Sequence, residues 1–164
     1  MSREMKPAAR RQLPIPARTQ VSTPNTHAPA EHDTVATVGR DVAQRVLHLR
    51  EDDLREREHL ARVLIHSVLG IPGDQLAEIV TAPARIGAPH WDAFLQALVA
   101  WRCQAAQPRI QTPDWAKDTH LDEAWAPFGG SIRDNGWYVL SVLSTPAAFL
   151  HRGIVLDRKN LEEL

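Results

Sequence analysis

The sequence predicts a mainly α-helical protein: a small helical domain with a short extended segment near its C-terminus, preceded by a disordered N-terminal tail. Three observations support this fold class. Residues 1–34 contain five prolines among small polar residues, whereas no proline occurs from residue 35 to residue 71. Apolar residues then recur at helical spacing in two long stretches. All nine aromatic residues lie between Trp91 and Phe149, and such side chains dominate core packing.

The tail and the domain differ in composition. Residues 1–34 have too few bulky apolar groups to offset the entropy cost of ordering them, so we expect disorder there. Residues 35–164 are enough for a single helical domain with its own core, and residues 89–164 should form its aromatic-rich packing half. The basic residues of the tail have no aromatic residues between them, so we interpret it as a solvated tail.

The first helical stretch begins at about Val35 and predicts either one long helix or a pair. A spacing of seven residues, which favours a single helix face, relates Leu47, Leu54, Ala61 and Val68. The middle of this stretch is almost entirely charged. We favour a solvated helix face there, with a break near Asp52 and Asp53 as the alternative.

The second helical stretch is the clearest in the chain. Residues 70–73 should end the preceding helix, and Asp74 is placed to cap a short helix from Gln75 to about Val80. After a connector, Pro89 suits the first turn of a longer helix. Apolar residues at helical spacing continue this helix to about Ala106.

The C-terminal part has a less regular pattern. The apolar run Trp137–Leu143 fits either a buried strand or a buried helix turn. Thr145 can cap a short helix that has Pro146 at its first position and Gly153 as its left-handed terminator.

The chain should end in an extended segment and a helical turn. Residues 154–156 are three consecutive apolar residues, which we expect to be extended. Asp157 can then cap a final turn that reaches Leu164.

Composition limits the compartment and the partners. A formal net charge of −1 gives no chain-wide attraction to nucleic acid or anionic lipid. The single cysteine, Cys103, cannot form an intrachain disulfide, which favours a reducing compartment. No apolar run approaches the roughly 18 residues that a membrane span requires. We therefore predict a cytoplasmic protein that does not bind membranes.

Few residues are candidates for catalysis or metal binding. His48, His59 and His66 lie at offsets of 11 and 7, whereas helical metal sites favour offsets of three or four. His120 has acidic neighbours that could bind a hard cation or serve as a general base, but we favour a solvated loop. Nucleophile and phosphate-binding motifs are absent from the sequence. We predict no catalytic residue, no metal site and no cofactor.

Three tryptophans outside the clearest helix are the candidate partner-binding residues. Trp115, Trp125 and Trp137 lie in segments rich in turn residues, where large amphipathic side chains can line a groove or anchor a partner. The alternative, which we favour, is that these irregular segments use their bulkiest residues to cover a small core.

Residues 89–157 resemble a group of small actinobacterial proteins. The resemblance is carried by Trp91-Asp92-Ala93 at a helix start, by Pro113-Asp114-Trp115, and by a segment of the form P-A-A-F-x-x-(R/H)-G-I-x-(L/V)-D at residues 146–157. Some members of that group are antitoxin-like and carry an N-terminal helix-turn-helix module. The resemblance implies a regulatory or partner-binding role. DNA binding is not carried over, because this chain has no clear helix-turn-helix.

Three functional hypotheses follow. The first is a non-enzymatic protein-interaction or regulatory protein, antitoxin-like, whose aromatic C-terminal half binds a protein partner. The second is a DNA-binding regulator that uses residues 54–81 as a degenerate helix-turn-helix, with the basic tail adding phosphate contacts. We keep nucleic acid as an alternative partner and do not favour it. The third is a hydrolase or metal enzyme built around His120.

Overall fold

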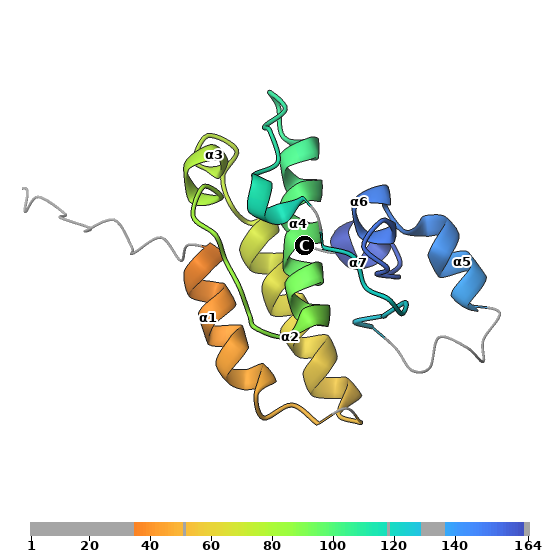
Figure 1. The fold of residues 1–164 in the computed structure, drawn as a ribbon. Coiled ribbons are helices and arrows are strands. Elements are labelled where there is room, and N and C mark those ends of the chain that lie inside the picture. Colours follow the sequence, from red (N-terminus) through yellow and green to blue (C-terminus); the bar gives the residue numbers. More distant parts are fainter. Residues whose placement is uncertain (1–34, 51, 118, 129–136, 163–164) are drawn as a thin grey trace, which may run out of the picture. The chain divides into compact units, whose positions relative to one another are not determined.

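The computed structural model describes residues 35–50, 52–117, 119–128 and 137–162, with only the backbone of Trp137 included. These residues belong to one compact unit, His32–Leu164. All regular elements among them are helical, which confirms the predicted fold class (Figure 1). The predicted disordered tail, residues 1–34, lies outside the described residues.

The helices follow one another in a simple order. They are α1 (Val35–Val46), α2 (Leu54–Leu69), α3 (Leu76–Ile79), α4 (Pro89–Ala105), the 3-10 helix η1 (Asp114–Ala116), α5 (Trp137–Ser144), α6 (Ala147–Leu150) and α7 (Lys159–Glu162). In Figure 1, α1 and α2 lie side by side and α4 packs against α2. Helix α4 also contacts α6 and η1.

Helices α1 and α2 are separated by a break, so the favoured expectation of a continuous solvated helix was wrong. Asp53 caps α2, because its carboxylate accepts the N–H of Glu56 at 3.0 Å. Leu47 and Leu54 flank the break and are 75% and 40% exposed, so they do not belong to the predicted apolar face. The later members of that face, Ala61 and Val68, are buried as predicted.

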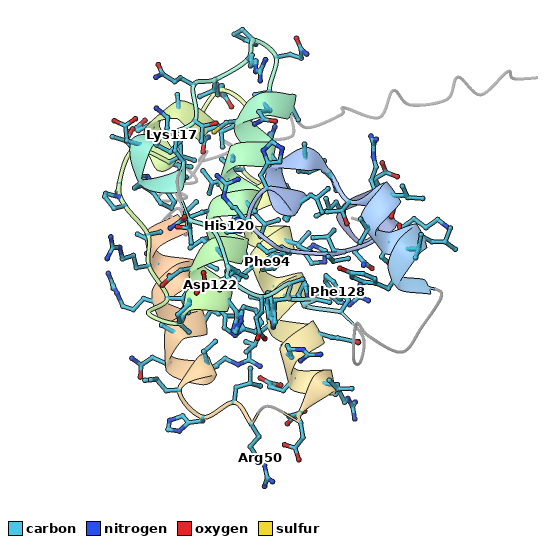
Figure 2. All side chains as sticks on the ribbon, turned by 45° about the vertical axis from the view of Figure 1, so that its right-hand side comes forward. Arg50, Phe94, Lys117, His120, Asp122 and Phe128 are labelled. Carbon is cyan, nitrogen blue, oxygen red and sulfur yellow. The ribbon has the colours of Figure 1, made fainter. Side chains whose placement is uncertain are left out.

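Helix α4 forms the centre of the core. Ten of its 17 residues are buried, from Trp91 to Cys103, as expected for a helix that is apolar on nearly all sides. Pro89 is its first residue, as predicted. The Asp92 carboxylate accepts the backbone N–H of Ile86 at 2.6 Å, which holds the connector against the helix start. Figure 2 shows the fully buried Phe94 among the surrounding helices.

Two predicted caps were wrong. Helix α3 begins at Leu76 with Gln75 as its N-cap, and no side chain makes a capping hydrogen bond there, so Asp74 does not cap it. Helix α6 has Pro146 as its N-cap. The Thr145 hydroxyl instead lies 2.6 Å from the Ser141 carbonyl oxygen and accepts the N–H of Leu156 at 3.2 Å. Thr145 therefore joins the end of α5 to the chain after α6.

The segment after α6 is extended, as predicted. Ile154 forms an isolated parallel bridge with Trp125. The backbone N–H of Trp125 donates to the backbone carbonyl oxygen of Gly153 at 2.8 Å. Gly153 has a φ of +75°, which confirms the predicted left-handed terminator. The Asp157 carboxylate accepts the N–H of Lys159 at 2.9 Å and so caps α7. The ambiguous run Trp137–Leu143 is helical and forms most of α5.

Candidate interaction surface

Trp115 is held by the core of the domain. It lies in η1, is half-buried and packs against the central cluster of apolar side chains. Its indole N–H donates to the carbonyl oxygen of Val80, just after α3, at 2.9 Å. This side chain therefore joins η1 to the end of α3.

Trp125 is also half-buried and packs against the start of α4. Its ring centroid lies 5.3 Å from that of Trp91 and 6.1 Å from that of Phe94, both in edge-on arrangements. On its outer side it stacks on the exposed His90 at 5.4 Å. The predicted tryptophans thus contact different elements: Trp115 contacts the end of α3 and Trp125 the start of α4.

Trp137, the third candidate, is the first residue of α5, and its side chain lies outside the described part of the structure. The rest of α5 has an unusual exposure pattern. Val139, Leu140 and Leu143 are 59%, 64% and 77% exposed. Ser141, by contrast, is only 3% exposed, and its hydroxyl has no hydrogen-bond partner among the described residues.

The exposed residues of α5 share one side of the helix. At 100° per residue, Val139 and Leu143 are separated by one turn, Leu140 lies beside Leu143, and Ser141 lies on the opposite side. We call Val139, Leu140 and Leu143 the α5 face. Helix α5 contains no charged residue. It therefore directs a serine inward and three large apolar side chains outward, the reverse of an ordinary surface helix. Figure 1 shows α5 beyond α6 as seen from α4.

Sequence reasoning missed the α5 face. The apolar run was expected to be buried, and its composition supports that expectation. The two serines of α5, Ser141 and Ser144, are three residues apart and form a polar stripe, which would normally face solvent. No pattern in the sequence therefore predicts the observed orientation, in which Ser141 faces the domain and Leu143 faces solvent.

The described residues around His120 do not form a metal-binding group. His120 is exposed, and its Nδ1 lies 2.8 Å from the carbonyl oxygen of His151. Asp122 and Glu123 are exposed, and Asp118 lies outside the described residues. In the part of the chain that the structure describes, no group of three or more His, Cys, Asp or Glu side chains could hold a metal ion. Figure 2 labels His120 and Asp122 on this loop.

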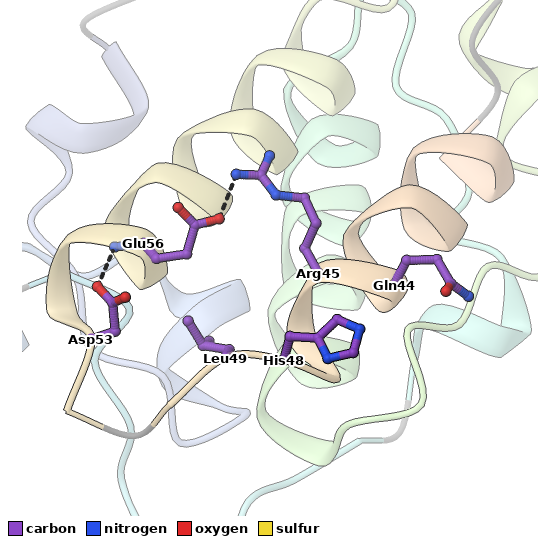
Figure 3. A pocket seen from close by; sticks show the side chains of 6 residues that line it. All are labelled: Gln44, Arg45, His48, Leu49, Asp53 and Glu56. Atoms are coloured by element: carbon purple, nitrogen blue, oxygen red, sulfur yellow. Dashed lines mark hydrogen bonds and ion pairs between the residues drawn. The ribbon is translucent and has the colours of Figure 1, made fainter.

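A polar pocket of about 420 Å³ lies where α1 ends and α2 begins (Figure 3). Its lining residues are Gln44, Arg45, His48, Leu49, Asp53 and Glu56. Arg45 and Glu56 form an ion pair across it, and Asp53 accepts the N–H of Glu56. These charged groups therefore join the two helices to each other.

A second pocket of about 520 Å³ lies between α4, residues 112–117 and α6. Arg152 lines it and is only 7% exposed. Its guanidinium donates to the carbonyl oxygens of Ala148 at 2.6 Å and Lys117 at 3.2 Å, and also to that of Ala116. Arg152 thus clamps the η1 segment to α6.

Residues 54–81 do not provide an ordinary recognition helix. Helix α3 has four residues, and its exposed residues are Ala77 and Glu78. A recognition helix places several residues along the major groove, and an acidic side chain there would face phosphates.

Cys103 does not have the environment of a reactive cysteine. It is buried, and burial raises the pKa of its thiol.

No protein-family model, curated protein or solved structure matches this chain. Within the described residues, no helix has both the length and the apolar character needed to cross a bilayer.

Proposed function

We propose that the protein is a non-enzymatic protein-interaction protein with a regulatory, antitoxin-like role, and that its C-terminal half binds a partner protein through the α5 face. The observation that carries this proposal is the orientation of α5. The helix buries Ser141 at 3% exposure while Leu143 is 77% exposed. Turning the helix over would bury the leucine, so the domain leaves apolar area uncovered that a partner can cover.

The size of the α5 face suits a small contact. Its three side chains expose roughly 350 Å², which corresponds to about 9 kcal/mol of gross burial energy before the costs of association. An area of this size is ordinary for a single surface patch. The inward serine and the lack of charge in α5 therefore support a partner contact more strongly than the exposed area does.

The regulatory part of the proposal is supported by the resemblance of residues 89–157 to the group of small actinobacterial proteins, some of which are antitoxin-like. The tryptophan hypothesis is modified. Trp115 and Trp125 are half-buried against the core, so we place the contact on α5, whose first residue is Trp137.

Cross-linking in the native host tests the proposal. A photoreactive phenylalanine analogue replaces Leu143 in one variant and Leu47 in the other. Leu47 is the matched control because it is the same residue type, is 75% exposed and lies in another part of the fold. We expect a specific protein adduct from position 143 that is absent from position 47. Equal yields of the same adducts at both positions would contradict the proposal.

The regulatory role needs a second readout. If the adduct contains a different protein, the activity of that protein is measured with the wild-type chain and with Leu143→Glu. We expect the wild-type chain to change that activity and the variant to lose the effect. An activity that neither chain alters would contradict a regulatory role.

A further inference from the structure

The pocket between α4, residues 112–117 and α6 takes no part in the proposed function. Its volume of about 520 Å³ lies within the range of roughly 300–1,000 Å³ that is typical of small-molecule sites. We call it the α4–α6 pocket. Its polar and charged lining residues are Gln104, Thr112, Lys117, His151 and Arg152.

The walls of the α4–α6 pocket are fixed in place. Arg152 is only 7% exposed, and its guanidinium donates to the carbonyl oxygens of Ala148 in α6 and of Lys117 at the end of η1. Ala100 and Ala148 line the pocket and are buried, so two of its walls carry small side chains that leave the space open. The pocket is therefore formed before any ligand binds.

The ionisable residues that line this pocket are basic. Lys117 and Arg152 are cations, and the His151 imidazole can donate a hydrogen bond in its neutral or its charged form. None of the described lining residues is acidic. The pocket therefore favours a negatively charged ligand over a neutral or positively charged one.

The ion pair that Lys117 makes is easily exchanged. Its ammonium lies 2.5 Å from the carboxylate of Asp114, whose side chain is 95% exposed. Exposed ion pairs contribute little to stability, because water and salt screen them. A bound anion can therefore replace Asp114 as the partner of Lys117, which Figure 2 labels.

Three further side chains of the pocket are available to a ligand. The Gln104 amide, the Thr112 hydroxyl and the His151 imidazole make no hydrogen bond with other described residues. Each can donate to an oxygen atom. Together with the Lys117 ammonium, they give the pocket four available donors.

We propose that the α4–α6 pocket binds the phosphate group of a small anion, with Lys117 as the main cationic contact. A phosphate offers three strong acceptor oxygens, whereas a carboxylate offers two, so phosphate satisfies more of the donors. A phosphate group alone fills only part of the pocket, which leaves room for a small organic group. The site lies apart from α5, so this inference does not depend on the proposed function.

Titration of the purified full-length chain with inorganic phosphate, and separately with phenyl phosphate, tests the proposal. Backbone amide shifts are followed by NMR at constant ionic strength. We expect saturable shifts at residue 117 and at residues 147–152, with dissociation constants of about 1 mM. Tighter binding of phenyl phosphate would identify an organic ligand, and equal binding would identify free phosphate. Sodium acetate should bind at least about fivefold more weakly than phosphate.

One pair of variants tests the cation. Lys117→Gln should weaken phosphate binding at least about fivefold, because it removes a charged donor. The matched control is Lys159→Gln, since Lys159 is an exposed lysine in α7. It loses the same charge and should bind phosphate as the wild type does.

A second pair tests the exchange of partners. Asp114→Asn should tighten phosphate binding by about threefold, because it removes the carboxylate that competes for Lys117. The matched control Asp74→Asn changes an exposed residue elsewhere and should leave the affinity unchanged. Far-UV circular dichroism and the unfolding midpoint establish that all variants fold.

The contrary outcomes are equally clear. The absence of saturable shifts up to about 20 mM of either phosphate probe would overturn the proposal. So would equal weakening by Lys117→Gln and Lys159→Gln, or an Asp114→Asn variant that binds phosphate no better than Asp74→Asn does. Acetate that binds as tightly as phosphate would overturn the assignment of a phosphate group.

Discussion

Replacing Arg152 with methionine should lower the free energy of unfolding by about 4 kcal/mol. Arg152 is 7% exposed, and its guanidinium donates hydrogen bonds to the carbonyl oxygens of Ala116, Lys117 and Ala148. Hydrogen bonds from a charged donor contribute about 1.5–3 kcal/mol each, and the carbonyls that lose the donor keep their desolvation cost. The expected loss is smaller than the sum of these hydrogen-bond contributions, because the methionine side chain still fills much of the space that the arginine leaves.

Urea unfolding monitored by tryptophan fluorescence measures this loss. At an m-value of about 1.5 kcal/mol per molar urea, the midpoint should fall by more than about 2 M. The matched control is Arg158→Met, because Arg158 is 64% exposed and pairs with Glu162 at 2.7 Å on the surface. Such pairs contribute about 0–1 kcal/mol, so its midpoint should move by less than about 0.7 M. Equal shifts in the two variants would refute the clamp assigned to Arg152.

Three further predictions use simple measurements. Ser141→Ala should raise the free energy of unfolding by about 1 kcal/mol, because the buried Ser141 hydroxyl has no hydrogen-bond partner among the described residues. A decrease in the free energy of unfolding would contradict the inward orientation of that side chain. Gly153→Ala should lower the free energy of unfolding by about 2 kcal/mol, because φ is +75° and an added Cβ would lie 3.2 Å from Leu121. The control Gly73→Ala has open space around the added Cβ, and an equal loss there would contradict this reasoning. The Cys103 thiol, whose pKa burial raises, should react with a disulfide reagent at pH 8 only after unfolding, and fast reaction of the native protein would contradict its placement.

The core helix could be predicted from the sequence because several local signals agree there. Pro89 marks the first position of α4, and apolar residues continue at helical spacing to its end. The turn at Gly153 was predictable for a similar reason, because glycine readily adopts the positive φ that the chain needs there. In both places, local conformational preference and tertiary packing favour the same structure.

The break between α1 and α2 was harder to predict. The seven-residue spacing of Leu47 and Leu54 favours a continuous helix, but residues 50–53 between them are all charged, so this spacing alone does not determine whether the helix continues. The deciding interaction is the cap made by Asp53, and Asp52 beside it offers an equally good capping side chain. The role of Thr145 could not be predicted for the same reason. Its hydroxyl donates to the backbone carbonyl of Leu156, eleven residues away, and no local sequence pattern predicts such a partner.

The candidate site was predictable only in its location. The C-terminal half was expected to hold it, and the sequence indicated the tryptophans as contact residues, because tryptophans are frequent anchors of interfaces. Two of them, Trp115 and Trp125, pack against the core. The outward direction of Leu140 and Leu143 depends on how α5 meets the rest of the domain, and helical periodicity in an uncharged segment does not determine it.

The coverage of the α5 face inside cells tests the account most directly. Cysteine replaces Leu143 or Leu47 in two variants that keep the buried Cys103, which is expected not to react in the native protein. The rate of maleimide labelling is then compared between dilute purified protein and intact host cells. Because the two leucines have nearly equal exposure, 77% and 75%, their labelling rates should be similar in dilute solution. The account predicts that labelling at position 143 slows at least about fivefold relative to position 47 in cells, where a protein covers the face. An unchanged ratio of the two rates would contradict it.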